Sequence, residues 1–195
     1  MSELNLGGTI RLAGDTVTDP KGVAHRLMGL GLPRPVLWQA VTLVVVLSVM
    51  LAQVTAFLAP MAMGMEAMLG GPLVLGVIQI GLTVLMILGT FYIGRGFGGT
   101  GTLDDTILLI AWLQVVMILL QVVQTVLLVV LPPLAAVVGV AGLVIFVWIY
   151  INFVAALHGF ASLGLVFAGA VVSLLGGLFG LSLILTLIGI SAPEM

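Results

Sequence analysis

Five long runs of apolar residues, separated by short polar or proline-containing stretches, dominate the chain. An α-helix needs about 20 such residues to cross the hydrocarbon of a bilayer, and each run is long enough. Proline falls between the runs, at Pro60, Pro72, Pro132 and Pro133, where it ends one helix or begins the next. We predict five transmembrane helices, over residues 36–59, 73–93, 107–131, 134–157 and 164–190, with the third and fourth forming a tight antiparallel hairpin.

The segment before the first run has a different pattern. In TDPKGVAHRLMGLGLP, Asp19 stands where a helix N-cap is favoured, and Pro20 follows at the first helical position. At about 100° per residue, the apolar side chains share one face, and Lys21, His25 and Arg26 share the other. We predict an amphipathic helix over residues 20–31, lying along the membrane interface. It belongs to a polar arm, residues 1–35, that precedes a transmembrane domain over residues 36–195.

The composition supports an all-α polytopic membrane protein. Apolar residues make up 62% of the chain and charged residues 6%, and no Asp, Glu, Lys or Arg occurs between Thr106 and Pro193. The net charge of -2 indicates neither an acidic nor a basic partner, and nothing in the sequence indicates nucleic acid. Because the chain has no cysteine, it has no disulfide framework and no thiolate ligand.

The basic residues predict the orientation, because Lys and Arg in short flanking segments stay on the cytoplasmic side. All five lie in the arm or in the second connection between the predicted spans: Arg11, Lys21, Arg26, Arg34 and Arg95. The other connections and the C-terminal tail have none. We therefore predict a cytoplasmic N-terminus and, with five spans, a C-terminus on the outer side.

The second connection, GRGFGGTG at residues 94–101, contains a literal G-x-G-x-x-G. A dinucleotide site needs these glycines between a strand and a helix, with an acidic residue about 20 positions later. Here a membrane helix precedes them and no acid follows at that distance, so we predict no cofactor. Arg95 and the acidic pair Asp104 and Asp105 instead suit the adjoining helix ends, and we expect an ion pair between Arg95 and one of these acids. Thr102 and Asp105 have capping-box spacing.

Three stretches together resemble the Yip domain family. They are TDPKGVAHRLMGLGLP, YIGRGFGGTGTLDDTILLIAWLQ and FVAALHGFASLG, in that order. The resemblance implies a five-span fold with a cytoplasmic N-terminus. Eukaryotic members are Golgi and endoplasmic reticulum proteins that bind Rab-type GTPases in vesicle transport. This sequence is similar to the shorter bacterial branch, which implies the bacterial inner membrane, with the C-terminus in the periplasm.

Six polar residues are predicted to lie on the cytoplasmic side, and they are our candidates for contact with lipid or a protein partner: Lys21, Arg26, Arg95, Asp104, Asp105 and His158. His158 is expected at the cytoplasmic end of the fourth helix, where an imidazolium suits the helix dipole. The alternative is that these residues are ordinary helix-end charges. A catalytic or metal role for His158 would need a second ionisable group beside it.

Polar residues also occur within the predicted spans. Gln114, Gln121 and Gln124 share one side of the third helix. We favour hydrogen bonds between helices, because transport routes usually carry an ionisable group at depth and this stripe has none. The alternative is a hydrophilic path in a small transporter or channel subunit. Small residues on the fifth helix predict close helix packing, within the bundle or between copies: Gly169, Ser173, Gly176, Gly177 and Gly180.

The first external connection is rich in methionine, at Met61, Met63, Met65 and Met68. Thioethers with this spacing are soft ligands that suit Cu(I), but methionine is also an adaptable filler of apolar surfaces, which is the interpretation we favour.

No arrangement of nucleophile and base, and no H-E-x-x-H or acidic metal cage, occurs in the sequence. We therefore predict a non-enzymatic membrane scaffold. Its arm and the loop over residues 94–105 are expected to contact membrane lipids and a protein partner or a second copy, with no small-molecule substrate.

Overall fold

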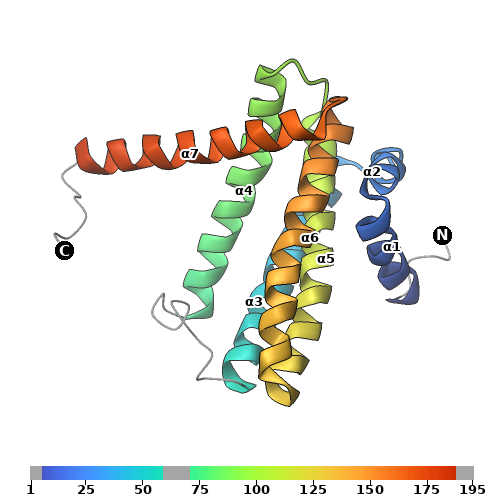
Figure 1. Ribbon diagram of the computed structural model, residues 1–195, viewed down its shortest axis with the longest axis vertical. Helices are drawn as coiled ribbons and strands as arrows, with labels where there is room; N and C mark the ends of the chain where they lie inside the picture. Colours follow the sequence, from blue (N-terminus) through green and yellow to red (C-terminus); the bar gives the residue numbers. More distant parts are fainter. Residues whose placement is uncertain (1–5, 59–70, 188–195) are drawn as a thin grey trace.

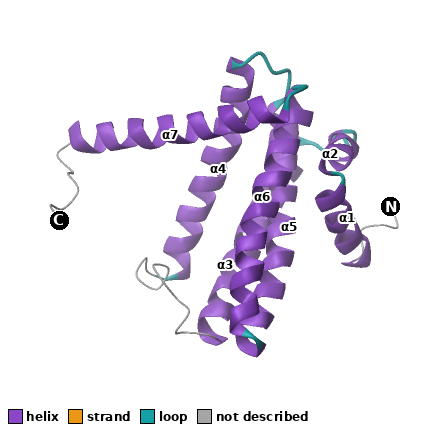
Figure 2. Cartoon of the chain, in the orientation of Figure 1, coloured by secondary structure: helices purple, strands orange, loops and turns teal. Residues whose placement is uncertain are grey.

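The computed structural model describes residues 6–58 and 71–187, and every regular element in these ranges is an α-helix (Figures 1 and 2). Two short helices come first, and five long ones follow. In chain order they are α1 (Leu6–Thr18), α2 (Pro20–Met28), α3 (Arg34–Leu58), α4 (Pro72–Gly96), α5 (Leu103–Val130), α6 (Pro132–His158) and α7 (Leu163–Leu187).

Four of these helices, α3 to α6, are long and apolar enough to cross a membrane. The chain is therefore a multi-pass membrane protein. The predicted hairpin is confirmed, because α5 ends at Val130 and α6 begins at Pro132, with Leu131 alone between them. α5 lies at the centre of the bundle and contacts α3, α4, α6 and both short helices.

The bundle has two distinct ends. At the charged end, α3 and α5 begin and α4 and α6 end, so that Arg34, Arg95, Asp104 and His158 lie there. At the hairpin end, Leu131 joins α5 to α6. All three Trp and both Tyr of the chain lie within ten residues of the helix termini at the charged end: Trp38, Tyr92, Trp112, Trp148 and Tyr150. Aromatic residues of these two types are typical of the membrane interface.

The N-terminal arm is more ordered than predicted. The sequence pattern predicted one helix over residues 20–31, whereas the structure has α1 before it, and α2 ends at Met28. The Asp19 cap is confirmed, since its carboxylate accepts a hydrogen bond from the backbone N–H of Gly22 at 2.9 Å. The expectation that the helix simply lies along the interface is incomplete, because Val23 and Ala24 of α2 are fully buried against the bundle.

The predicted fifth span corresponds to α7. In Figure 1, α7 leaves the bundle at the charged end and runs across the direction of α4 to α6. Its contact with α6 is made near its start, where Val166 packs against Ile151 and Ala155. Leu165, Leu174 and Phe179 are each more than 60% exposed. The four spans are thus present in the structure, and a fifth remains a prediction.

Candidate functional site at the charged end

Glycines at the end of α4 and in the loop between α4 and α5 pack against His158. This histidine is the last residue of α6 and is only 3% exposed. A Cβ atom at Gly94 or Gly99 would overlap the imidazole ring, and one at Gly101 would lie 2.7 Å from Cγ of Leu157. The glycines therefore allow the loop backbone to approach the end of α6 closely, which explains their abundance without a nucleotide.

Both ring nitrogens of His158 have backbone partners. The N–H of Gly101 donates to Nδ1 at 3.3 Å, so Nδ1 is the acceptor and Nε2 donates to the carbonyl of Thr90 at 3.1 Å. The carbonyl of His158 accepts from the N–H of Thr100 at 3.4 Å. These bonds join the end of α6 to α4 and to the loop. The hydroxyl groups of Thr90 and Tyr150, 2.9 Å apart, add a further contact between α4 and α6.

The predicted ion pair of Arg95 is wrong. Asp104 pairs instead with Arg34, whose Nε donates to the carboxylate at 2.6 Å, and this contact joins the starts of α3 and α5. Arg95 lies over the ring of Phe91, with its guanidinium carbon 5.6 Å from the ring centroid. Arg95 and Asp104 each suit the helix end at which they lie. Their closeness in the sequence suggested a pair, but it did not reveal that α3 begins beside α5.

The capping box at the start of α5 is confirmed in part. Thr102 Oγ1 accepts a hydrogen bond from the backbone N–H of Asp105 at 3.1 Å, as the motif requires. The carboxylate of Asp105 accepts from the hydroxyl of Thr102 at 2.6 Å, instead of from its backbone N–H. The side chain of Asp105 therefore fixes the first turn of α5.

Two tryptophans hold the arm to the bundle. Nε1 of Trp112 on α5 donates to Oγ1 of Thr16 at 2.9 Å, and Nε1 of Trp148 on α6 donates to the carbonyl of Val17 at 3.1 Å. Thr16 is fully buried, and its hydroxyl donates to the carbonyl of Leu12. The sequence pattern did not single out either tryptophan, although indoles in otherwise aliphatic spans are a signal of polar partners.

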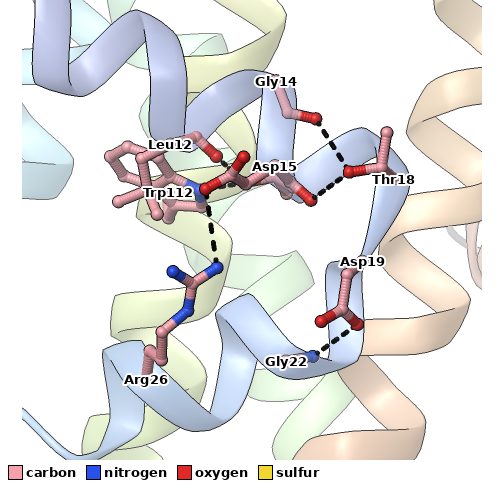
Figure 3. A network of polar contacts seen from close by, with 9 residues as sticks. Leu12, Gly14, Asp15, Thr18, Asp19, Gly22, Arg26 and Trp112 are labelled. Atoms are coloured by element: carbon pink, nitrogen blue, oxygen red, sulfur yellow. Dashed lines mark hydrogen bonds and ion pairs between the residues drawn. The ribbon is translucent and has the colours of Figure 1, made fainter.

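Within the arm, an ion pair joins α1 to α2, and local hydrogen bonds close the end of α1 and the start of α2 (Figure 3). Arg26 on α2 reaches back to Asp15 on α1, with 3.7 Å between nitrogen and oxygen. Thr18 donates to the carbonyls of Asp15 and Gly14, and Asp19 caps α2. The two helices therefore form one hairpin, which Figure 1 shows beside the upper part of α5 and α6.

The six residues predicted as an interaction cluster lie at the charged end, but they do not form one cluster. Arg26 pairs with Asp15, Asp104 with Arg34, and His158 with the glycine loop. In the part of the chain that the structure describes, every Asp contacts another group of the protein, while Arg11, Lys21 and Arg95 have no acidic partner within 4.0 Å.

The glutamine stripe of α5 divides between two surfaces. Gln114 faces α4, where its Nε2 donates to the hydroxyl of Thr83 at 2.9 Å, and its Oε1 is buried without a partner among the described residues. Gln121 and Gln124 line a groove of 340 Å³ between α5 and α6. The hydroxyl groups of Thr55 and Thr125, 2.7 Å apart, join α3 to α5 nearby.

The remaining predicted sites have fewer contacts. The glycines at 169, 176, 177 and 180 of α7 have open space where a Cβ would lie, and Ser173 donates to the carbonyl of Gly169 within the helix. Met61, Met63, Met65 and Met68 lie outside the described residues. Among residues 6–58 and 71–187, no three His, Asp or Glu side chains gather as a metal site would require.

Comparison with known proteins gives one result. A family model described as the Yip1 domain matches residues 14–184, which include α2 to α6 and most of α7. Searches of curated proteins and of solved structures gave no match. The matched region begins within α1 and contains the tryptophan contacts, the glycine loop and His158. The chain therefore belongs to the Yip1 domain family.

Proposed function

We propose that this protein is a membrane-organising scaffold of the bacterial inner membrane. Its charged end faces the cytoplasm and contacts anionic lipid and a protein partner through the arm and the loop over residues 94–105. Proteins of the Yip1 family are generally non-enzymatic membrane proteins, which agrees with this role. The observation that carries the proposal is a polar surface at the charged end, where Lys21 and Arg95 have no acidic partner among the described residues.

The surface is fixed by contacts to the bundle. His158 holds the loop, and the two tryptophans hold the arm. Within residues 6–58 and 71–187, Lys21 and Arg95 have no acidic side chain within 4.0 Å. A cation beside an anionic leaflet contributes about 1 kcal/mol of attraction. The belt of Trp and Tyr near this end supports a position at the headgroup level.

Lipid recognition is tested by replacing one of these cations. The Arg95→Ala variant should retain roughly fivefold less anionic lipid than the wild type, because about 1 kcal/mol of attraction is lost. Native mass spectrometry of protein extracted from vesicles of mixed anionic and zwitterionic lipid measures this ratio. The control is Arg34→Gln with Asp104→Asn, which removes an ion pair but leaves the net charge unchanged. Equal anionic lipid in Arg95→Ala and wild type would contradict the proposal.

Partner binding is tested by crosslinking in native membranes, followed by identification of the captured proteins. Arg95→Ala and Asp105→Ala should each lower capture of a specific protein, while Gln39→Ala on the exposed side of α3 should not. If both changes leave capture and cellular phenotype as in wild type, the loop has no part in partner binding.

A further inference from the structure

The groove between α5 and α6 contains two amide groups with no partner. Neither Gln121 nor Gln124 makes a side-chain hydrogen bond within the described residues. The side chain of Gln124 lies over α6, since a Cβ at Gly139 would be 2.7 Å from its Nε2. By the rise of an α-helix, Gln124 and Gln121 lie about 10 and 15 Å from Leu131 at the hairpin end. This depth is within the hydrocarbon of a bilayer, where an unpaired amide is costly.

The groove lies on a face of α5 and α6 whose other half, nearer the charged end, is already covered by α1 and α2. Met117 and Phe146 line the groove and also pack against the cluster that buries α1 and α2 on the bundle. The arm therefore covers this face near the charged end, and the groove continues it toward the hairpin end. Gly139 and Gly142 line the groove, and the amide of Gln124 lies over Gly139.

We propose that a second copy of this chain packs on the groove about a two-fold axis. The side-chain amides of Gln121 and Gln124 in one copy then form hydrogen bonds with those of Gln121 and Gln124 in the other. A two-fold interface places one patch against itself and therefore needs self-complementary groups. An amide carries both donors and an acceptor, so it meets this requirement, whereas lipid chains at this depth offer neither. Leu143, 65% exposed at the rim, would lie close to Leu143 of the second copy across the two-fold axis.

The absence of cysteine from the chain allows a direct test by disulfide crosslinking in native membranes. A Leu143→Cys variant should form a crosslinked dimer on mild oxidation. The matched control is Leu82→Cys on α4, which is 60% exposed and lies at a similar depth but outside the groove. If Leu143→Cys gives no more dimer than Leu82→Cys, the proposal is overturned.

The amides are tested in the Leu143→Cys background. Gln121→Leu with Gln124→Leu should lower the association constant roughly sevenfold, the effect of losing two hydrogen bonds between helices. Gln79→Leu changes an intramembrane amide of α4 that does not line the groove, and it should have no effect. A second variant, Gly142→Leu, fills the groove while keeping both amides, and it should also prevent the crosslink. If the groove variants give as much crosslinked dimer as the Leu143→Cys protein alone, the proposal is overturned.

Native mass spectrometry separates a second copy from a lipid as the occupant. Wild type should appear mainly as a dimer, and the groove variants should show a larger share of folded monomer. A monomeric wild type that loses a bound lipid on Gln121→Leu and Gln124→Leu would overturn the proposal and make the groove a lipid site. This test reads association of copies, so its result is independent of the lipid and partner contacts proposed for the charged end.

Discussion

At the scale of single residues, the end of α6 is closely packed against backbone. The ring of His158 fills the space that Gly94 and Gly99 leave, and both of its nitrogens are bonded to backbone groups. A side chain at either glycine would need the volume that the ring occupies. Because protein interiors are close packed, neither the loop nor the ring can move away without loss of other contacts.

Gly94, which contacts the ring of His158, should therefore not tolerate a larger residue. Gly94→Ala is expected to destabilise the protein by about 1–3 kcal/mol, the usual cost of overpacking a core. Gly96, two residues on, has nothing within 4 Å of an added Cβ, so Gly96→Ala should leave stability equal or slightly higher. Thermal unfolding in detergent micelles, followed by circular dichroism, measures the difference.

A double-mutant cycle separates the contact from other effects of alanine at position 94. In a His158→Ala background, the space beside Gly94 is empty, so Gly94→Ala should cost much less than it does in wild type. An equal cost in both backgrounds would mean that the ring does not occupy the volume we assign to it.

At the scale of helices, the sequence predicted what depends on local pattern. The spans from α3 to α6 follow from runs of apolar residues, and the Asp19 cap and the turn at Leu131 follow from neighbouring residues. α1 was missed because its three glycines, Gly7, Gly8 and Gly14, are poor helix formers, and its packing on α5 and α6 compensates for them.

For the site at the charged end, the sequence predicted which residues lie there but not which of them contact one another. Its defining contacts join residues far apart in the chain: His158 lies 57 residues from Gly101, and Arg34 lies 70 residues from Asp104. Pattern and capping rules act within a few residues, so they placed Arg95 beside the nearest acids. The fold instead brings α3 to the acid and leaves Arg95 over an aromatic ring.

The docking of the arm should depend on the two indole hydrogen bonds. Trp112→Phe with Trp148→Phe removes both donors while keeping aromatic rings in place. At about 1 kcal/mol for each bond, the arm should open roughly thirtyfold more often. Limited trypsin digestion at Arg11, Lys21 and Arg26 measures opening as a cleavage rate.

The third tryptophan gives the matched control for this digestion. Trp38 on α3 packs against the cluster of Leu37 and Ile107, which contains no residue of the arm. Trp38→Phe should therefore leave cleavage of the arm as in wild type. Cleavage that is unchanged in the double variant, or equally fast in Trp38→Phe, would show that the indole bonds do not hold the arm.

At the scale of the whole molecule, the two ends of the bundle differ in chemistry. All basic residues of the chain belong to α1, α2 or helix termini at the charged end, and the tryptophans and tyrosines lie near the same end. This asymmetry favours a single orientation, with the charged end in the cytoplasm. α7 has large apolar side chains exposed around it, including Leu165, Phe167 and Leu175, so it suits hydrocarbon better than an interface.

Single cysteines can report this orientation, because the wild type has none. Phe97→Cys, at an exposed position of the charged end, should be protected from a membrane-impermeant maleimide in intact cells and react after lysis. Leu131→Cys at the hairpin end should react in intact cells. The opposite pattern of labelling would reverse the orientation that the basic residues predict.

The position of the C-terminus then decides between four spans and five. α7 has 25 residues, and about 20 suffice to cross, so we expect it to turn into the bilayer and place the C-terminus outside. An alkaline phosphatase fused after Met195 should therefore be active, because that enzyme matures only outside the cytoplasm. A fusion at Phe97, in the charged-end loop, is the control and should be inactive. If the C-terminal fusion is inactive while the cysteine labelling is as predicted, α7 does not cross, and the protein has four spans with both termini on one side.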